Sequence, residues 1–196
     1  VRAESDAERE SESIITGRPI VFNQRTDLGW FDEEIAPGAL DNTDLTDVRF
    51  LVNHDLSKIP LARSRNNNLK STMQLEKNEN GLDITARIDI EANADARALD
   101  SAVRRGDISG MSFMFFIDAD EWENLESDHP LRRITSISRV VEVSAVTFPA
   151  YNATSINARG LSDALEGARA SLESAKAEQR EIERRKQKIR ILTEVQ

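Results

Sequence analysis

The chain has no cysteine and only two histidines among its 196 residues. The lack of cysteine excludes disulfide cross-links and thiolate metal sites, and two histidines are too few for a His-rich metal centre. No apolar run approaches the ~18 residues that a membrane-spanning helix requires. The composition therefore predicts no thiolate metal site, no His-rich metal site and no membrane partner.

Basic residues are also too few to balance the acidic ones, and the net charge is −9. Residues 160–196 hold eight Lys and Arg against seven Asp and Glu, so residues 1–159 carry 18 basic and 28 acidic side chains, or −10. Because sequence-independent DNA binding depends on neutralising phosphates, this acidic body predicts no nucleic-acid partner.

The patterning predicts three segments: a disordered charged leader over residues 1–13, a domain over 14–160 and a C-terminal helix over 161–196. Within the domain, helices are expected at 39–45 and at 94–105, the second ended by Gly106. Many strands with few helices indicate an α+β domain built mainly from strands, in a closed or nearly closed barrel. The predicted strands cover residues 14–22, 30–35, 48–52, 69–75, 82–90, 111–117, 131–137 and 139–147.

Apolar and small residues in the last segment recur at heptad spacing, which predicts a long helix. Two interpretations stay open: a single helix packed on the body, or a coiled coil that forms a homo-oligomer or binds a partner. The basic run at 184–188 is interpreted as a solvated helical face rather than a nucleic-acid patch. The heptad positions are Leu161, Leu165, Ala168, Leu172, Ala175, Gln179, Ile182, Lys186 and Ile189.

Ser112 places a hydroxyl at the start of an apolar strand, on the face that it shares with Met114 and Phe116. A buried hydroxyl costs about 1–3 kcal/mol unless it forms a hydrogen bond. Either it bonds a neighbouring carbonyl, or it is a nucleophile. Ser109 is the rival serine, and turn chemistry accounts for it.

His54 follows a predicted apolar strand, between Asn53 and Asp55. An imidazole there is either a surface side chain of a turn or a general base near neutral pH. His129 lies in a polar segment that predicts an exposed loop, so His54 is the better candidate.

Glu142 lies among valines, where an unpaired carboxylate would be costly to bury. It either faces outward, forms a salt bridge with Arg139 or Arg133, or accepts a hydrogen bond from a catalytic imidazole.

Taken in order, these fragments resemble the prohead (procapsid maturation) serine proteases of tailed bacteriophages. Single fragments are weakly diagnostic, whereas the ordered set is specific. The matching fragments are residues 17–23, 34–39, 52–55, 60–63, 81–82, 105–113, 120–122, 133–134 and 142–151.

The resemblance implies a herpesvirus-protease-like β-barrel surrounded by helices, and a serine endopeptidase without a cofactor. The family's catalytic serine, histidine and acidic residue fall on Ser112, His54 and Glu142. The family pattern has glycine where this chain has Met114, which would affect the level of activity. The oxyanion donors are expected to be backbone N–H groups or the guanidinium groups of Arg132 and Arg133.

The resemblance also implies the biology. Such an enzyme lies inside the procapsid in the host bacterial cytoplasm, where it cleaves the scaffolding protein or the scaffold segment of the major capsid protein, and often itself. The alternatives are a catalytically weak or inactive scaffold or capsid-interaction protein of the same fold, and a β-barrel binding module with a dimerising helix.

Overall fold

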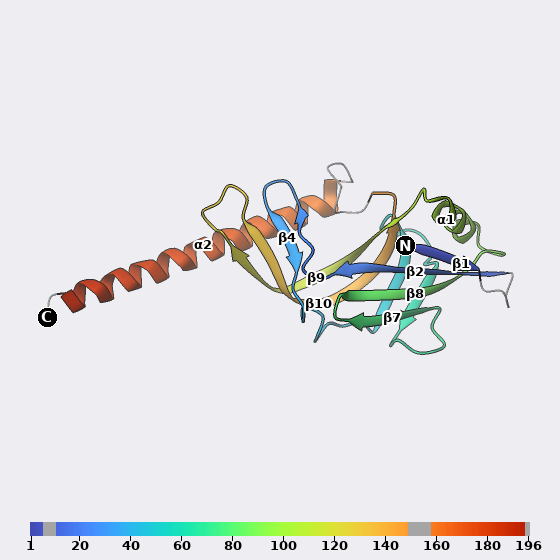
Figure 1. Cartoon of the computed structure of the whole chain (residues 1–196), viewed down its shortest axis with the longest axis horizontal. Helices are drawn as coiled ribbons and strands as arrows, with labels where there is room; N and C mark the ends of the chain where they lie inside the picture. Colours follow the sequence, from blue (N-terminus) through green and yellow to red (C-terminus); the bar gives the residue numbers. More distant parts are fainter. Residues whose placement is uncertain (6–10, 149–157, 195–196) are drawn as a thin grey trace.

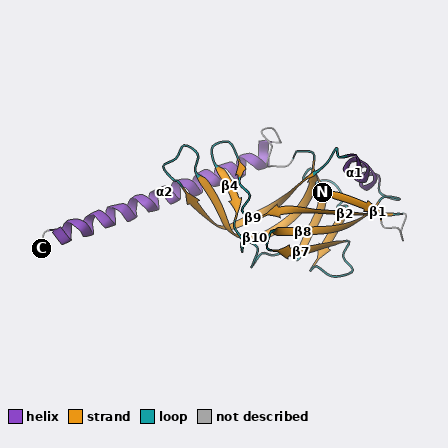
Figure 2. Cartoon of the chain, in the orientation of Figure 1, coloured by secondary structure: helices purple, strands orange, loops and turns teal. Residues whose placement is uncertain are grey.

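Two β-sheets and two helices make up the part of the chain that the computed structural model describes, residues 1–5, 11–148 and 158–194 (Figures 1 and 2). The first sheet has the order β1-β2-β8-β7, formed by β1 (Arg2–Ser5), β2 (Glu12–Val21), β7 (Met73–Asn78) and β8 (Gly81–Asp89). The second has the order β3-β4-β10-β5-β6, and β9 pairs with β10. Its strands are β3 (Thr26–Asp27), β4 (Asp32–Ile35), β5 (Asp47–Val52), β6 (Ala62–Arg65), β9 (Gly110–Glu123) and β10 (Leu131–Val146).

One hydrophobic core joins the two sheets. Ile15 and Ile88 of the first sheet and Phe50 and Val143 of the second belong to the same buried cluster. The helix α1 (Ala94–Arg105) adds Leu99 from its buried face. The prediction of a mixed domain built mainly from strands is therefore confirmed. Of the predicted closed or nearly closed barrel, the closed form is not found among the described strands, which form two separate sheets, each with its own edge strands.

The local signals at α1 are confirmed. The side chain of Asn93 accepts hydrogen bonds from the first-turn N–H groups, and Gly106 ends the helix with a left-handed φ of 79°. Asp100 anchors this helix to β2 by accepting a hydrogen bond of 2.6 Å from the buried Ser13 hydroxyl. Burial opposes ionisation of Asp100, but hydrogen bonds from Arg104 and Ser13 outweigh it and lower its pKa.

Three other predictions are corrected. Residues 2–5 of the predicted disordered leader form β1, which pairs with β2. Residues 37–42 are turns instead of a helix over 39–45, since Pro37 and Gly38 favour a turn. The two strands predicted at 131–137 and 139–147 are one long strand, β10, whose pairing with β9 is interrupted by register shifts.

The C-terminal helix α2 (Ala158–Glu194) packs on the far end of the β9–β10 hairpin and then continues beyond the strands (Figure 1). The Trp122 indole N–H donates to the Ser171 hydroxyl at 3.0 Å. The Arg169 guanidinium lies 5.4 Å from the centroid of the Trp30 ring. No described helix combines the length and the apolar character that crossing a membrane would require.

The heptad positions of α2 divide at about Ala175. Ala168 and Leu172 are buried, whereas Ile182 and Ile189 are 45% and 64% exposed. The first part of the helix therefore packs on the body, as one of the two interpretations expects, and the second part presents its apolar side chains to solvent.

Candidate active site

The candidate residues come together where β5, β10 and β9 lie side by side. β10 is the middle strand, pairing in parallel with β5 through residues 142–145 and antiparallel with β9. Ser112 of β9 lies directly opposite Ser144 of β10, and Met114 lies opposite Glu142. Residues directly opposite each other project from the same face of a sheet. The four side chains therefore share one face.

A β-bulge decides which face that is. Val140, Val143 and Ala145 all contribute to the core, although strict alternation would place Val140 on the face opposite the other two. The register shift between Val140 and Glu142 inserts one extra residue and reverses the alternation. Because of it, Glu142 and Ser144 point away from the core.

His54 occupies a left-handed turn at the end of β5. Asn53 and His54 have φ angles of 52° and 57°, a conformation that residues other than glycine seldom adopt. The Asn53 side chain holds this turn to the end of β10, since its Oδ1 accepts the Thr147 N–H at 2.9 Å and its Nδ2 donates to Thr147 Oγ1 at 3.2 Å. The Asn53 N–H also donates to the Ala145 carbonyl at 3.0 Å.

The imidazole of His54 contacts the carboxylate of Glu142. Nδ1 of His54 lies 2.5 Å from Oε1 of Glu142, whose side chain is fully buried while that of His54 is 31% exposed. The hydroxyl of Ser144 donates to the other oxygen, Oε2, at 2.5 Å and accepts the backbone N–H of His54 at 3.1 Å. Both carboxylate oxygens thus act as acceptors, which places the imidazole proton on Nδ1 and leaves Nε2 able to accept a proton.

Ser112 is almost buried, at 6% exposure. Among the described residues, no side-chain hydrogen bond of Ser112 occurs, so the carbonyl partner that would explain a purely structural serine is absent there. Ser112 Oγ and His54 Nε2 are also not hydrogen-bonded to each other. Catalytic hydrogen bonds of this kind are often long before a substrate binds.

Beyond His54, the chain turns outward. Hydrogen bonds from the Ser57 hydroxyl and backbone N–H lower the pKa of Asp55, whose carboxylate lies in this turn. In the same loop, the side chains of Leu56 and Ile59 are 60% and 82% exposed to solvent. A solvent-facing loop with two exposed apolar side chains therefore follows His54.

The other candidates lie elsewhere. Arg133 pairs with Glu34 at 3.0 Å and Arg139 lies 3.7 Å from Asp44, so neither forms the salt bridge considered for Glu142. Arg132 precedes Ser144 by twelve residues on β10, a distance of roughly 40 Å along an extended strand. The guanidinium groups of Arg132 and Arg133 are thus too distant to stabilise an oxyanion at Ser112.

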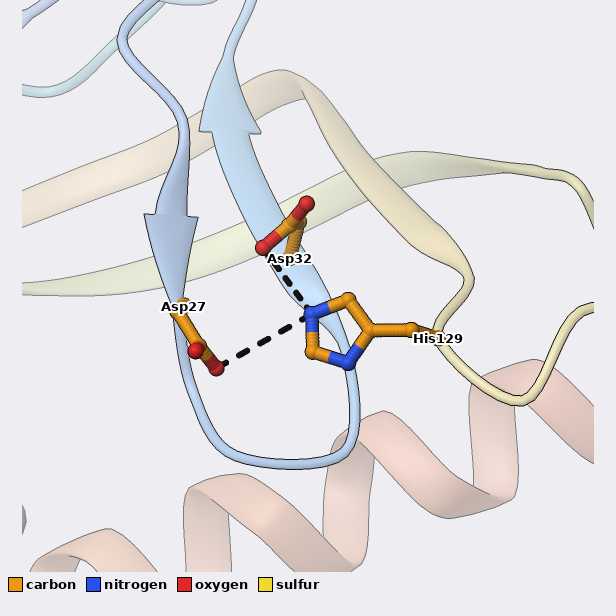
Figure 3. A group of neighbouring side chains, drawn as sticks. All are labelled: Asp27, Asp32 and His129. Atoms are coloured by element: carbon orange, nitrogen blue, oxygen red, sulfur yellow. Dashed lines mark hydrogen bonds and ion pairs between the residues drawn. The ribbon is translucent and has the colours of Figure 1, made fainter.

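His129 also lies at the far end of the hairpin, in the loop between β9 and β10 (Figure 3). Its Nε2 is 3.0 Å from Asp32 Oδ1 and 3.8 Å from Asp27 Oδ1. The three side chains offer ligand atoms within 4.8 Å of one another, so they are a group that could hold a metal ion. The same geometry suits an ion pair once the imidazole is protonated, and it is remote from Ser112.

The sequence reasoning overlooked Ser144 and Asn53. Ser144 follows Glu142 by two residues in a strand, and this spacing alone could have indicated a hydroxyl on the carboxylate's face. Asn53 could have been found as the residue type that best tolerates a left-handed turn. Residues 149–151, the end of the fragment 142–151 that resembles the prohead proteases, lie outside the described residues.

Comparison with known proteins adds one finding. The family model described as Caudovirus prohead serine protease matches residues 1–166. No curated protein and no solved structure matches the chain.

Proposed function

The chain belongs to the Caudovirus prohead serine protease family, a family of serine peptidases, and from this membership we propose that Ser112, His54 and Glu142 are its catalytic triad. The observation that carries the proposal is the hydrogen bond of the His54 imidazole to the buried Glu142 carboxylate, on the sheet face that Ser112 shares. Membership of this family implies proteolysis during capsid maturation.

In the proposed mechanism, Ser112 Oγ attacks the carbonyl carbon of the scissile peptide bond. Its proton passes to Nε2 of His54, and Glu142 stabilises the resulting imidazolium through Nδ1–H. Collapse of the tetrahedral intermediate breaks the C–N bond, and the leaving amine takes the proton from Nε2. Water then hydrolyses the acyl-serine ester by the same proton transfers. Backbone N–H groups are the proposed oxyanion donors.

The proposed substrates are the scaffolding protein or the scaffold segment of the major capsid protein, and the chain itself, inside the procapsid in the host bacterial cytoplasm. The solvent-exposed apolar side chains of Leu56 and Ile59, in the loop that follows His54, support the binding of an extended protein segment.

The exposed end of α2 is the proposed attachment to the shell, to scaffold or to a second copy of the chain. Residues 180–190 hold six Lys and Arg and two Glu, in contrast to the acidic body. The exposed Ile182 and Ile189 lie at heptad positions in the same segment. An acidic amphipathic helix would complement both features.

The test compares wild type with Ser112→Ala and with Ser109→Ala as the matched control, since Ser109 is an exposed serine three residues earlier. Each is coexpressed with scaffolding and capsid protein and treated separately with a serine-directed fluorophosphonate. We expect cleavage and labelling in wild type and Ser109→Ala, and neither in Ser112→Ala.

Equal cleavage by wild type and Ser112→Ala would contradict the assignment of Ser112. Neither cleavage nor labelling in any of the three proteins would favour the alternative function, an inactive scaffold or capsid-interaction protein of the same fold.

A further inference from the structure

We propose that Ser144 is a positioning residue of the peptidase site, which orients both His54 and Glu142 through its single hydroxyl. The inference rests on the proposed function, since it assigns a role within the same triad. It starts from a group that the catalytic steps do not use: a fully buried serine directly opposite the proposed nucleophile.

The hydroxyl of Ser144 joins two groups that the chemistry requires in fixed places. It donates to Glu142 Oε2 at 2.5 Å and accepts the His54 backbone N–H at 3.1 Å. A serine hydroxyl has one proton to donate, and the His54 N–H already occupies one of its acceptor positions. The proton is therefore directed to the carboxylate, whose other oxygen remains for the imidazole.

The hydrogen bond from the His54 N–H to Ser144 also helps to hold the left-handed turn at His54. His54 has a φ of 57°, in the left-handed region, which is less stable than the right-handed region for residues other than glycine. Such conformations persist where surrounding contacts hold them. The Ser144 hydroxyl binds the His54 backbone to β10, the strand that also carries Glu142. The same strand therefore positions both the imidazole and the carboxylate.

Ser144 itself cannot be the nucleophile of the resting site. Its side chain is fully buried and its proton is donated to Glu142, whereas Ser112 on the neighbouring strand is 6% exposed and has no such bond among the described residues. The two serines therefore have different roles: Ser112 is the nucleophile, and Ser144 positions His54 and Glu142.

The test uses the full chain, fluorophosphonate inactivation and the variants Ser144→Ala and Ser144→Thr. Ser13→Ala is the matched control, because Ser13 is also fully buried and donates to a carboxylate, Asp100, in the other sheet. We expect Ser144→Ala to lower the rate constant of inactivation about 10- to 100-fold, the effect of one hydrogen bond to a charged group. The reagent's binding constant should not change, because Ser144 does not reach solvent.

The threonine variant keeps the hydroxyl and should recover most of the lost rate. Ser13→Ala should lower stability without lowering the rate constant. Equal rate constants for Ser144→Ala and Ser13→Ala at equal folded fractions would overturn the proposal, even if Ser144→Thr fails to fold.

Proton NMR supplies a readout that does not require activity. The chain has only two histidines, so His129→Asn assigns the low-field Nδ1–H resonance of His54. This resonance should shift or disappear in Ser144→Ala and stay unchanged in Ser13→Ala; an unchanged resonance in Ser144→Ala refutes the positioning role. If wild type is labelled at a residue other than Ser112, the proposed triad fails, and this resonance still decides whether Ser144 holds His54 and Glu142 together.

Discussion

Replacing Glu142 by glutamine changes one oxygen of a buried carboxylate into an NH₂ group and removes the negative charge, while the size of the side chain stays nearly the same. In the wild type both oxygens accept hydrogen bonds, one from His54 Nδ1–H and one from the Ser144 hydroxyl. Because the Ser144 oxygen already accepts the His54 backbone N–H, its own proton needs an acceptor. The glutamine oxygen should therefore face Ser144, and its NH₂ group should face Nδ1. His54 must then carry its proton on Nε2, where it cannot accept the proton of Ser112.

The magnitude follows from these contacts. The opposite amide orientation would leave the Ser144 proton without an acceptor in a fully buried place, at a cost of about 1–3 kcal/mol. That cost alone favours the inactive tautomer by about 5- to 150-fold. Loss of the charge that stabilises the imidazolium adds to it. We expect kcat to fall by about 10³- to 10⁴-fold, as in other triads whose carboxylate becomes an amide.

The assay is the rate of scaffold cleavage and of fluorophosphonate labelling, both corrected for the folded fraction. Glu34→Gln is the matched control: Glu34 is 7% exposed and pairs with Arg133 at 3.0 Å, remote from Ser112. It should lose stability and keep its rate. A Glu142→Gln enzyme within about tenfold of the wild-type rate would refute the orientation of His54 by Glu142.

Four further outcomes are expected. Ser112→Cys introduces the only thiol of the chain, and its alkylation at pH 7 should slow by about tenfold or more when His54→Ala is added, if the imidazole activates this position. Ser64→Ala should raise the free energy of unfolding in urea by about 1 kcal/mol, because the fully buried Ser64 hydroxyl has no partner among the described residues. Asn53→Ala should lower it by about 1–3 kcal/mol, through lost hydrogen bonds and the left-handed φ, and a neutral result would contradict the strained turn. The lowered pKa of Asp100 means that its carboxylate stabilises the fold above about pH 4 and loses this effect as the pH falls through the folded-state pKa, so acid unfolding followed by circular dichroism should be shallower in Asp100→Asn.

Local signals predicted the elements whose cause is local. The cap at Gly106 and the helical face that includes Leu99 depend only on residues close together in the sequence, and α1 forms where these signals predict it. The strands predicted at 69–75 and 82–90 likewise correspond to β7 and β8, which pair with each other, although β7 begins at Met73 rather than at residue 69. Whether the strands close into a barrel depends on pairing between strands far apart in the sequence, and no local pattern specifies that pairing.

Residues 1–13, the predicted disordered leader, also show that local composition does not determine pairing with other strands. Its charged composition predicted disorder, but β1 gains backbone hydrogen bonds from β2, and Val1 donates to the Ser109 carbonyl at 2.9 Å. Ser109 lies far along the chain, and β2 is a separate strand that the composition of the leader does not describe. Tertiary pairing therefore overrode composition at this edge of the first sheet.

The geometry around Glu142 depends on two irregularities that periodicity cannot predict. Strict alternation from Val140 would turn Glu142 into the core, and the bulge between them turns it to the face of Ser112. The left-handed turn at Asn53 and His54 then directs the imidazole back over that face. The left-handed turn costs conformational energy, and it is held by hydrogen bonds to the end of β10, through Ser144, Ala145 and Thr147. Met114 lies opposite Glu142 where the pairing with β9 is regular from residue 142 to 146, so its side chain shares the face of the carboxylate without displacing the strand. The end of β10 is thus the common support of the proposed site, and changes there should affect His54 and Glu142 together rather than one at a time.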